Sequence, residues 1–140
     1  MPKPATGKCL CGSVGVAFTY ANDHFYACHC GMCRRWGGGP ALTVDTSNDL
    51  RFSGEEFISV FNSSDWAERG FCKQCGTHLF YRVKESGFTN ISLGILDNSE
   101  HLKFHSQIFI DKKPKHYHFS EQTETLTERE VQEKYSIPKI

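Results

Sequence analysis

The stretch that decides the fold is Cys72-Lys73-Gln74-Cys75-Gly76, in which two residues separate a pair of cysteines and a glycine follows. This spacing allows a tight turn, and Gly76 permits the positive φ with which the chain leaves it. A second close pair, Cys9-Leu10-Cys11, enters an alternating stretch that predicts a strand. Residues two apart on a strand point to the same face, so both thiolates can reach one ion. Joining the two pairs predicts a four-cysteine metal site that ties the N-terminal strand to the middle of the chain.

The other three cysteines lie within six residues, in Cys28-His29-Cys30-Gly31-Met32-Cys33. A turn at Gly31 can bring all three thiols onto one ion and leave one tetrahedral position open, which is the pattern of a catalytic zinc. His29 sits between two ligands and is expected to point away. Another histidine could close the site and make it structural, and spacing alone does not exclude other pairings of the three clusters.

The composition favours metal binding over a disulfide framework. Seven cysteines in 140 residues are an odd number, and the first seven residues lack the apolar region of a secretory signal. The apolar runs are too short to span a bilayer. We therefore expect a cytoplasmic protein whose thiols stay reduced. Lys plus Arg and Asp plus Glu number 16 each, which predicts no nucleic-acid and no membrane partner.

Many short stretches bounded by turn signals predict a mainly β fold in a single domain over residues 1–140. The expected strands are 13–20, 25–27, 41–44, 50–52, 57–62, 77–83, 90–96 and 107–110. Thr127 and Glu130 form a capping-box pattern that predicts a short C-terminal helix to about Tyr135. Zinc would add folding free energy to the modest core of such a protein.

Two features after the three-cysteine cluster are candidate contacts for a thiol substrate. Arg34 and Arg35 could attract an anionic substrate or offset the charge of the thiolates, or they could be a solvated pair. Gly38 lies in a run of three glycines whose backbone N–H groups could receive a carboxylate. The same run could equally be a plain loop.

Three motifs together resemble the glutathione-dependent formaldehyde-activating (GFA) family, also called the centromere protein V family. They are Gly7-Lys8-Cys9-Leu10-Cys11-Gly12-Ser13-Val14, Cys28-His29-Cys30-Gly31-Met32-Cys33-Arg34 and Phe71-Cys72-Lys73-Gln74-Cys75-Gly76-Thr77. The resemblance runs from Gly7 to about His118 and leaves 119–140 as a C-terminal extension. It implies a β-tent of small antiparallel sheets and two zinc ions per chain. The implied ligands are Cys9, Cys11, Cys72 and Cys75 for a structural zinc, and Cys28, Cys30 and Cys33 for a catalytic one.

The resemblance also implies an activity, that of a carbon–sulfur lyase. In reverse, this reaction adds glutathione to formaldehyde and gives S-hydroxymethylglutathione. The expected partners are a small thiol such as glutathione and a small aldehyde, bound by a monomer or a homodimer. The alternatives are a non-catalytic zinc module that binds a protein or a small thiol, and a thiol redox protein. The chain departs from the family at Lys115-His116-Tyr117, where relatives often carry a tryptophan.

Overall fold

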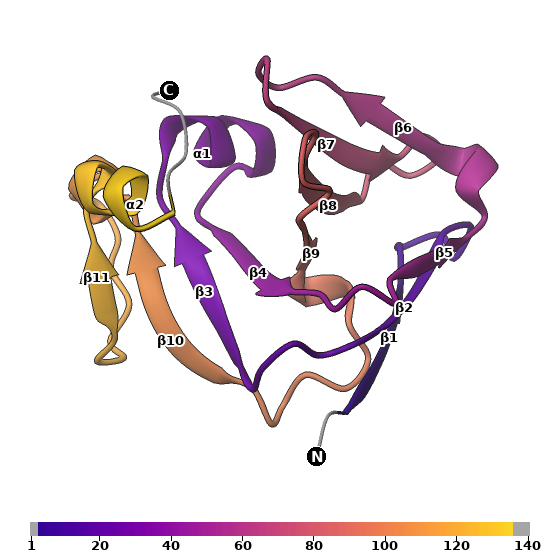
Figure 1. Ribbon diagram of the computed structural model, residues 1–140, viewed down its shortest axis with the longest axis horizontal. Coiled ribbons are helices and arrows are strands. Elements are labelled where there is room, and N and C mark those ends of the chain that lie inside the picture. The colour runs from indigo at the N-terminus through magenta and orange to yellow at the C-terminus, as the bar shows by residue number, and fades with distance from the viewer. Residues whose placement is uncertain (1–2, 136–140) are drawn as a thin grey trace. The chain divides into compact units, whose positions relative to one another are not determined.

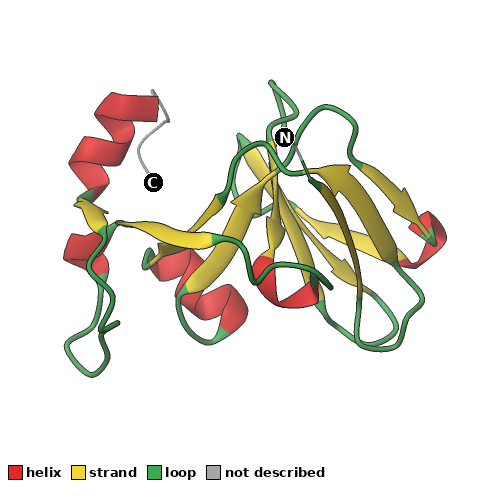
Figure 2. Cartoon of the chain, turned by 90° about the horizontal axis from the view of Figure 1, so that it is seen from below, coloured by secondary structure: helices red, strands yellow, loops and turns green. Residues whose placement is uncertain are grey.

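The computed structural model describes residues 3–135, and strands predominate among them (Figure 1 and Figure 2). The chain divides into two compact units, each made of two segments. The first unit contains residues 1–23 and 43–102, and the second contains residues 24–42 and 103–140. The strands belong to two sheets, and a short helix lies near the C-terminus. The expected mainly β fold is therefore confirmed.

A three-stranded antiparallel sheet lies wholly in the first unit. Its strands are β1 (Pro4–Lys8), β2 (Gly15–Thr19) and β5 (Arg51–Ser53), in the order β1-β2-β5. Val16 and Phe18 of β2 are buried, whereas Gly15, Ala17 and Thr19 are partly exposed. This alternation is the period of a half-buried strand, and it places the apolar side chains of β2 in the core of the unit.

Residues 43–45 of β4 and four further strands of the first unit pair in the order β4-β9-β8-β7-β6, and each pair is antiparallel. Their bounds are Ala41–Asp45 for β4, Thr89–Ser92 for β9, His78–Val83 for β8, Ala67–Cys72 for β7 and Ile58–Phe61 for β6. Two 3-10 turns, η1 (Glu55–Phe57) and η2 (Leu93–Ile95), interrupt the connections. Strand β7 ends at Cys72, so this antiparallel ladder positions the cysteine pair of residues 72–75.

The second unit contains three strands that pair in parallel. β10 (Lys103–Ile108) pairs with both β3 (His24–Cys28) and β11 (Glu124–Leu126). The resemblance implied a β-tent of small antiparallel sheets, and the parallel pairing of these distant segments departs from that expectation. The unit also contains α1 (Gly31–Gly37), η3 (Ile110–Lys112) and α2 (Glu128–Tyr135).

The predicted capping box begins helix α2. The Thr127 amide donates to Glu130 Oε1 at 3.0 Å, and the Glu130 amide donates to Thr127 Oγ1 at 3.2 Å. These reciprocal bonds satisfy two amides that the first turn of a helix leaves without a partner. The Glu128 amide also donates to Asp111 Oδ1 at 2.8 Å, which fastens the start of α2 to η3.

Candidate metal centres

Four cysteine sulfurs come together in the first unit. The sulfurs of Cys9, Cys11, Cys72 and Cys75 all lie within 4.8 Å of one another. The Cys9 sulfur is 3.7 Å from that of Cys11, which is 3.8 Å from that of Cys72. A tetrahedron with zinc–sulfur bonds of about 2.3 Å has sulfurs about 3.8 Å apart. The four thiols and their spacing therefore fit a zinc ion with four protein ligands.

The local structure around Cys9 and Cys11 differs from the prediction. They do not lie on a strand but in the turn between β1 and β2. The Gly12 amide donates to the Cys9 carbonyl at 3.0 Å, and the Cys9 amide donates to the Val14 carbonyl at 3.0 Å. These bonds fold the chain back on itself. The turn, and not the two-residue period of a strand, therefore brings the two sulfurs together.

The turn at Cys72–Gly76 has the predicted form. The Gly76 amide donates to the Cys72 carbonyl at 2.7 Å, and Gly76 has a φ of 79°. A hydrogen bond with the Thr77 hydroxyl, 3.1 Å from the Cys75 sulfur, is the main cause that lowers the pKa of Cys75 to about 5. The Ser13 hydroxyl likewise lowers the pKa of Cys11. Both effects favour the thiolate, which is the form that binds metal.

The three remaining cysteines form a second group, wholly in the second unit. Cys28 ends β3, Cys30 is the N-cap of α1 and Cys33 lies in the first turn of that helix. Their sulfurs lie within 4.8 Å of one another, and all three residues are buried. Within residues 3–135, no histidine nitrogen or carboxylate oxygen joins this group. Three soft sulfur donors fit zinc, and they leave one position of a tetrahedron without a described protein ligand.

Helix α1 was not predicted, and it has a cap at each end. The Cys33 amide donates to the Cys30 sulfur at 3.3 Å, so a cysteine takes the capping role that serine or aspartate usually fills. At the other end, Gly38 has a φ of 84°, and its amide donates to the Arg34 carbonyl. The sequence predicted only a turn at Gly31, whereas in the structure helix α1 holds Cys33 close to Cys30.

The three thiols disfavour each other's ionisation. Hydrogen bonds with the thiols of Cys30 and Cys33, followed by burial, raise the pKa of Cys28 well above its usual range. Three thiolates at this separation repel one another in a region with little water, so their joint ionisation requires a nearby cation. A metal ion supplies that charge and removes the thiol protons when it binds.

Apolar side chains from the C-terminal part of the chain cover the three cysteines. Phe109, Leu126 of β11 and Val131 of α2 are buried in one cluster with the cysteines. Met32, Ala41 and Ile108 pack against it. The resemblance left residues 119–140 as a C-terminal extension, and no spacing signal in the sequence connects Leu126 or Val131 to the cysteines. The part of this extension up to residue 135 therefore contributes directly to the surroundings of the second group.

His29 is fully buried and points away from the sulfur group, as expected. Its Nδ1 is 2.8 Å from the Tyr117 hydroxyl, and its Nε2 is 2.8 Å from Gln107 Oε1. Gln107 Nε2 in turn donates to the Thr123 hydroxyl at 3.1 Å. Burial is the main cause that lowers the pKa of His29, so its ring is neutral and has one donor and one acceptor nitrogen.

The three predicted substrate contacts have different surroundings. Arg34 is half-buried, and its Nε donates to the His29 carbonyl at 2.9 Å. Arg35 is exposed to solvent. The Gly38 amide is used in the C-cap of α1, so it is not available to receive a carboxylate. Of the three, Arg34 alone is tied by a hydrogen bond to the segment that carries Cys28 and Cys30.

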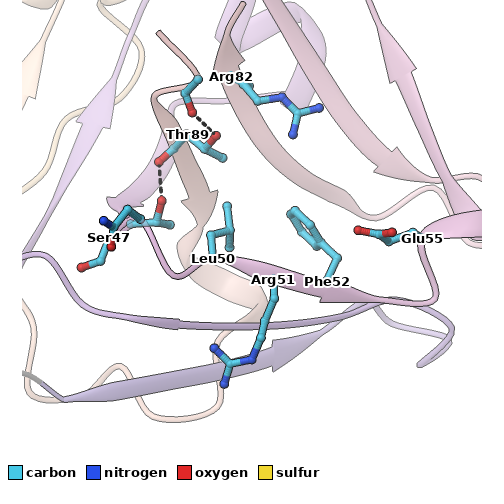
Figure 3. Close-up of a pocket in the computed structure, with 10 residues that line it drawn as sticks. Ser47, Leu50, Arg51, Phe52, Glu55, Arg82 and Thr89 are labelled. Atoms are coloured by element: carbon cyan, nitrogen blue, oxygen red, sulfur yellow. Dashed lines mark hydrogen bonds between the residues drawn. The ribbon is translucent and has the colours of Figure 1, made fainter.

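The first unit also contains a cavity of about 350 Å³, and no cysteine lines it (Figure 3). Leu50, Phe52 and Arg82 contribute to its walls. The Arg82 guanidinium bonds to Glu68 at 2.8 Å and lies 4.4 Å from the centre of the Phe80 ring. This cation therefore already has a carboxylate partner and an aromatic partner.

The comparison with protein families agrees with the two cysteine groups. The model of the glutathione-dependent formaldehyde-activating enzyme family matches residues 4–112, which include all seven cysteines. The chain belongs to the GFA family. The match stops before Leu126 and Val131, so two side chains that cover the second cysteine group lie beyond the part shared with the GFA model.

Individual relatives support this assignment to the GFA family. The chain is 31% identical over 131 residues to an uncharacterized lyase of Schizosaccharomyces pombe, with 89% of this chain and 92% of the relative covered. It is also 31% identical over 85 residues to a Podospora anserina protein whose name repeats the family description. That match covers 57% of this chain and 40% of the Podospora protein.

A solved structure supports the fold. A crystal structure of a Rhodobacter sphaeroides protein matches with a TM-score of 0.58 and 25% sequence identity, covering 66% of this chain and 88% of that one. Among the described residues of the present chain, no helix has the length and apolar character needed to cross a membrane.

Proposed function

We propose that the chain is a zinc-dependent lyase that forms and breaks the carbon–sulfur bond of a small thiol–aldehyde adduct. In the direction of synthesis, a thiol sulfur bonds to the aldehyde carbon, the thiol loses its proton and the aldehyde oxygen gains one. Membership of the GFA family and the lyase named among its relatives support this class of reaction. The family name supports glutathione and formaldehyde as the pair to test first.

The observation that carries the proposal is the second cysteine group, with three sulfurs and no fourth donor within residues 3–135. Zinc in such a site supplies a Lewis acid and lowers the pKa of a bound thiol. Cys28, Cys30 and Cys33 would hold this ion, and the Cys33 amide stabilises the Cys30 thiolate. Phe109, Leu126 and Val131 exclude water from one side of the group, which strengthens electrostatic interactions there.

The four-cysteine group has a different proposed role. Four thiolates complete a tetrahedron and leave no position for a substrate, so we assign Cys9, Cys11, Cys72 and Cys75 to a structural zinc. The family match covers residues from both compact units, which supports the proposal that the units form one family domain.

Adduct formation from formaldehyde and glutathione tests the proposal. Zinc-loaded protein should exceed the spontaneous rate, and Cys30→Ser should lose this excess together with about one of two zinc ions per chain. Arg129→Gln, which changes an exposed side chain of α2, serves as the control and should retain both properties. If wild-type protein holds both ions and yet gives no excess rate with any low-molecular-weight thiol, the lyase proposal is wrong. That result would favour the non-catalytic zinc module.

A further inference from the structure

We propose that the hydroxyl groups of Ser13 and Thr77 donate to the metal-bound sulfurs of Cys11 and Cys75, and thereby set how tightly the four-cysteine group holds its ion. We call these two side chains the hydroxyl pair. Both are positioning residues, because they contact metal ligands and not the reacting groups. The proposed role is separate from the lyase activity and depends only on metal binding by the four-cysteine group.

The four cysteines of this group differ in their exposure to solvent. Cys9 and Cys72 are buried, with 1% and 0% of their surface exposed. Cys11 is exposed and Cys75 is partly exposed, so water and oxidants can reach a bound ion beside these two. Each of them has a hydroxyl oxygen near its sulfur, at 3.2 Å for Cys11 and at 3.1 Å for Cys75. The hydroxyl pair therefore lies beside the two sulfurs that solvent can reach.

The hydrogen of the Thr77 hydroxyl has a fixed direction. The Leu10 amide lies 3.1 Å from Thr77 Oγ1, and an amide N–H can only donate. Thr77 Oγ1 is therefore the acceptor in this bond, and its single hydrogen is left for the Cys75 sulfur. A thiolate accepts such a hydrogen bond, and a bond to a charged acceptor is stronger than one between neutral groups. Thr77 is thus already oriented for a Cys75 that has lost its proton.

Ser13 is placed in the same way, but its hydrogen has two possible acceptors. Its Oγ is 3.2 Å from the Cys11 sulfur and 2.8 Å from Gln74 Oε1. While Cys11 keeps its proton, the thiol donates to Ser13 and Ser13 donates to Gln74. A Cys11 thiolate needs the hydrogen of Ser13 for itself, and the Gln74 amide must then turn over and donate to Ser13 Oγ. Ser13 therefore has to reorient when metal binds, whereas Thr77 does not.

The hydroxyl pair also joins the two turns that carry the cysteines. The Leu10–Thr77 and Ser13–Gln74 hydrogen bonds both run from the turn between β1 and β2 to the turn between β7 and β8. They connect positions that are 67 and 61 residues apart in the chain. Partners that orient metal ligands in this way typically change metal affinity by about 10- to 100-fold.

The competing explanation is that the hydroxyl pair only joins the two turns. In that case, loss of the Thr77 hydroxyl would loosen the group without changing the electronic properties of the bound thiolates. A hydrogen bond to a thiolate withdraws charge from its sulfur, so its loss makes the sulfur a better electron donor to the metal. The two explanations therefore predict different spectra for the metal-bound protein.

Cobalt(II) in place of zinc reports on the sulfurs, because its thiolate-to-metal charge-transfer band depends on their charge. Each variant is made in wild type and in Cys30→Ser, which lacks one ligand of the three-cysteine group, and zinc affinity is measured by competition with a chelator. We expect Thr77→Val to lower zinc affinity about tenfold or more and to shift the band to longer wavelength. Ser13→Ala should cause smaller changes in the same direction, because Ser13 must reorient. Thr77→Ser should retain the affinity and the band of the parent protein.

Thr46→Val is the matched control. It removes a half-buried hydroxyl of the same unit, which donates to the Thr89 carbonyl at 2.9 Å, and it should leave affinity and band unchanged. If Thr77→Val does not fold, Thr77→Ala replaces it, because the smaller side chain lets water reach the Leu10 amide.

Two results would overturn the role of the hydroxyl pair. The first is a Thr77→Val protein with the affinity and the band of its parent. The second is a lower affinity with an unchanged band, which would leave the pair only the role of joining the turns. None of these measurements needs turnover. A protein that shows both effects but does not accelerate adduct formation would retain the hydroxyl pair and lose the proposed lyase activity.

Discussion

Val131→Ala tests whether the C-terminal helix α2 covers the three-cysteine group. Val131 is 2% exposed and packs in one cluster with Cys28, Cys30 and Cys33. The substitution removes two carbon groups at about 0.8 kcal/mol each, and the cavity left behind adds to that loss. We therefore expect the free energy of unfolding to fall by about 2 to 3 kcal/mol. The loss should come with faster reaction of the three thiols in metal-free protein, because water and reagents enter the cavity.

Urea unfolding of zinc-loaded protein measures the free energy of unfolding. Mass spectrometry of alkylated peptides from metal-free protein measures how fast the three thiols react. Glu133→Ala is the matched control, because Glu133 lies on the same helix with its side chain 67% exposed. The ion pair of Glu133 with Arg129 is also exposed, so we expect Glu133→Ala to change the free energy of unfolding by less than about 0.5 kcal/mol. A Val131→Ala protein that loses less than about 0.5 kcal/mol and shows unchanged alkylation would refute the packing of α2 on the cysteine group.

Three further substitutions or titrations test other parts of the structure. In metal-free protein, Cys75 should be alkylated first, with a midpoint near pH 5, and Cys28 should be alkylated last. The reason is that a low pKa keeps the reactive thiolate present as the pH falls. Peptide mass spectrometry measures the order of alkylation, and a Cys28 that reacts first at about pH 6 would contradict this prediction. His29→Leu should cost about 2 to 4 kcal/mol in urea unfolding, since it leaves both side-chain partners of the ring unsatisfied. Gly70→Ala should lower the thermal midpoint, because the added Cβ would lie 2.2 Å from the Phe80 ring, at a cost of about 1 to 3 kcal/mol. A Gly70→Ala midpoint equal to that of wild type would show that the ring can move freely.

The sequence predicted most strands of the first unit, because short stretches rich in β-branched and aromatic residues stand between turn signals. Expected strands at 41–44 and 77–83 correspond closely to β4 and β8. Strand β7 was missed because Glu68 and Arg69 interrupt its apolar pattern. In the structure Glu68 pairs with Arg82 on the neighbouring strand, and Arg69 is buried near the Tyr81 ring. Cross-strand partners of this kind depend on register, which the local pattern does not contain.

The cysteine groups were predictable from spacing, whereas their surroundings were not. Clusters of two and three thiols with one or two residues between neighbours indicate chelation in a chain whose odd number of cysteines does not favour a disulfide framework. The short helix α1 begins with a sulfur as its cap and has glycine at both ends, and glycine is a poor helix former. The side chains that cover the second group come from segments about 75 to 100 residues later in the chain. Such contacts follow from tertiary structure, and no local signal reports them.

The two cysteine groups close loops of very different length. Cys11 and Cys72 are 61 positions apart, whereas Cys28 and Cys33 lie within six residues. Closing a long loop removes more conformational entropy from the unfolded chain than closing a short one, although this cost grows only slowly with loop length. An ion bound by the first group would therefore link the turn between β1 and β2 to the turn after β7, and its loss would remove that link. An ion bound by the second group would close only a loop of six residues, so its exchange would leave the long-range link of the first group intact.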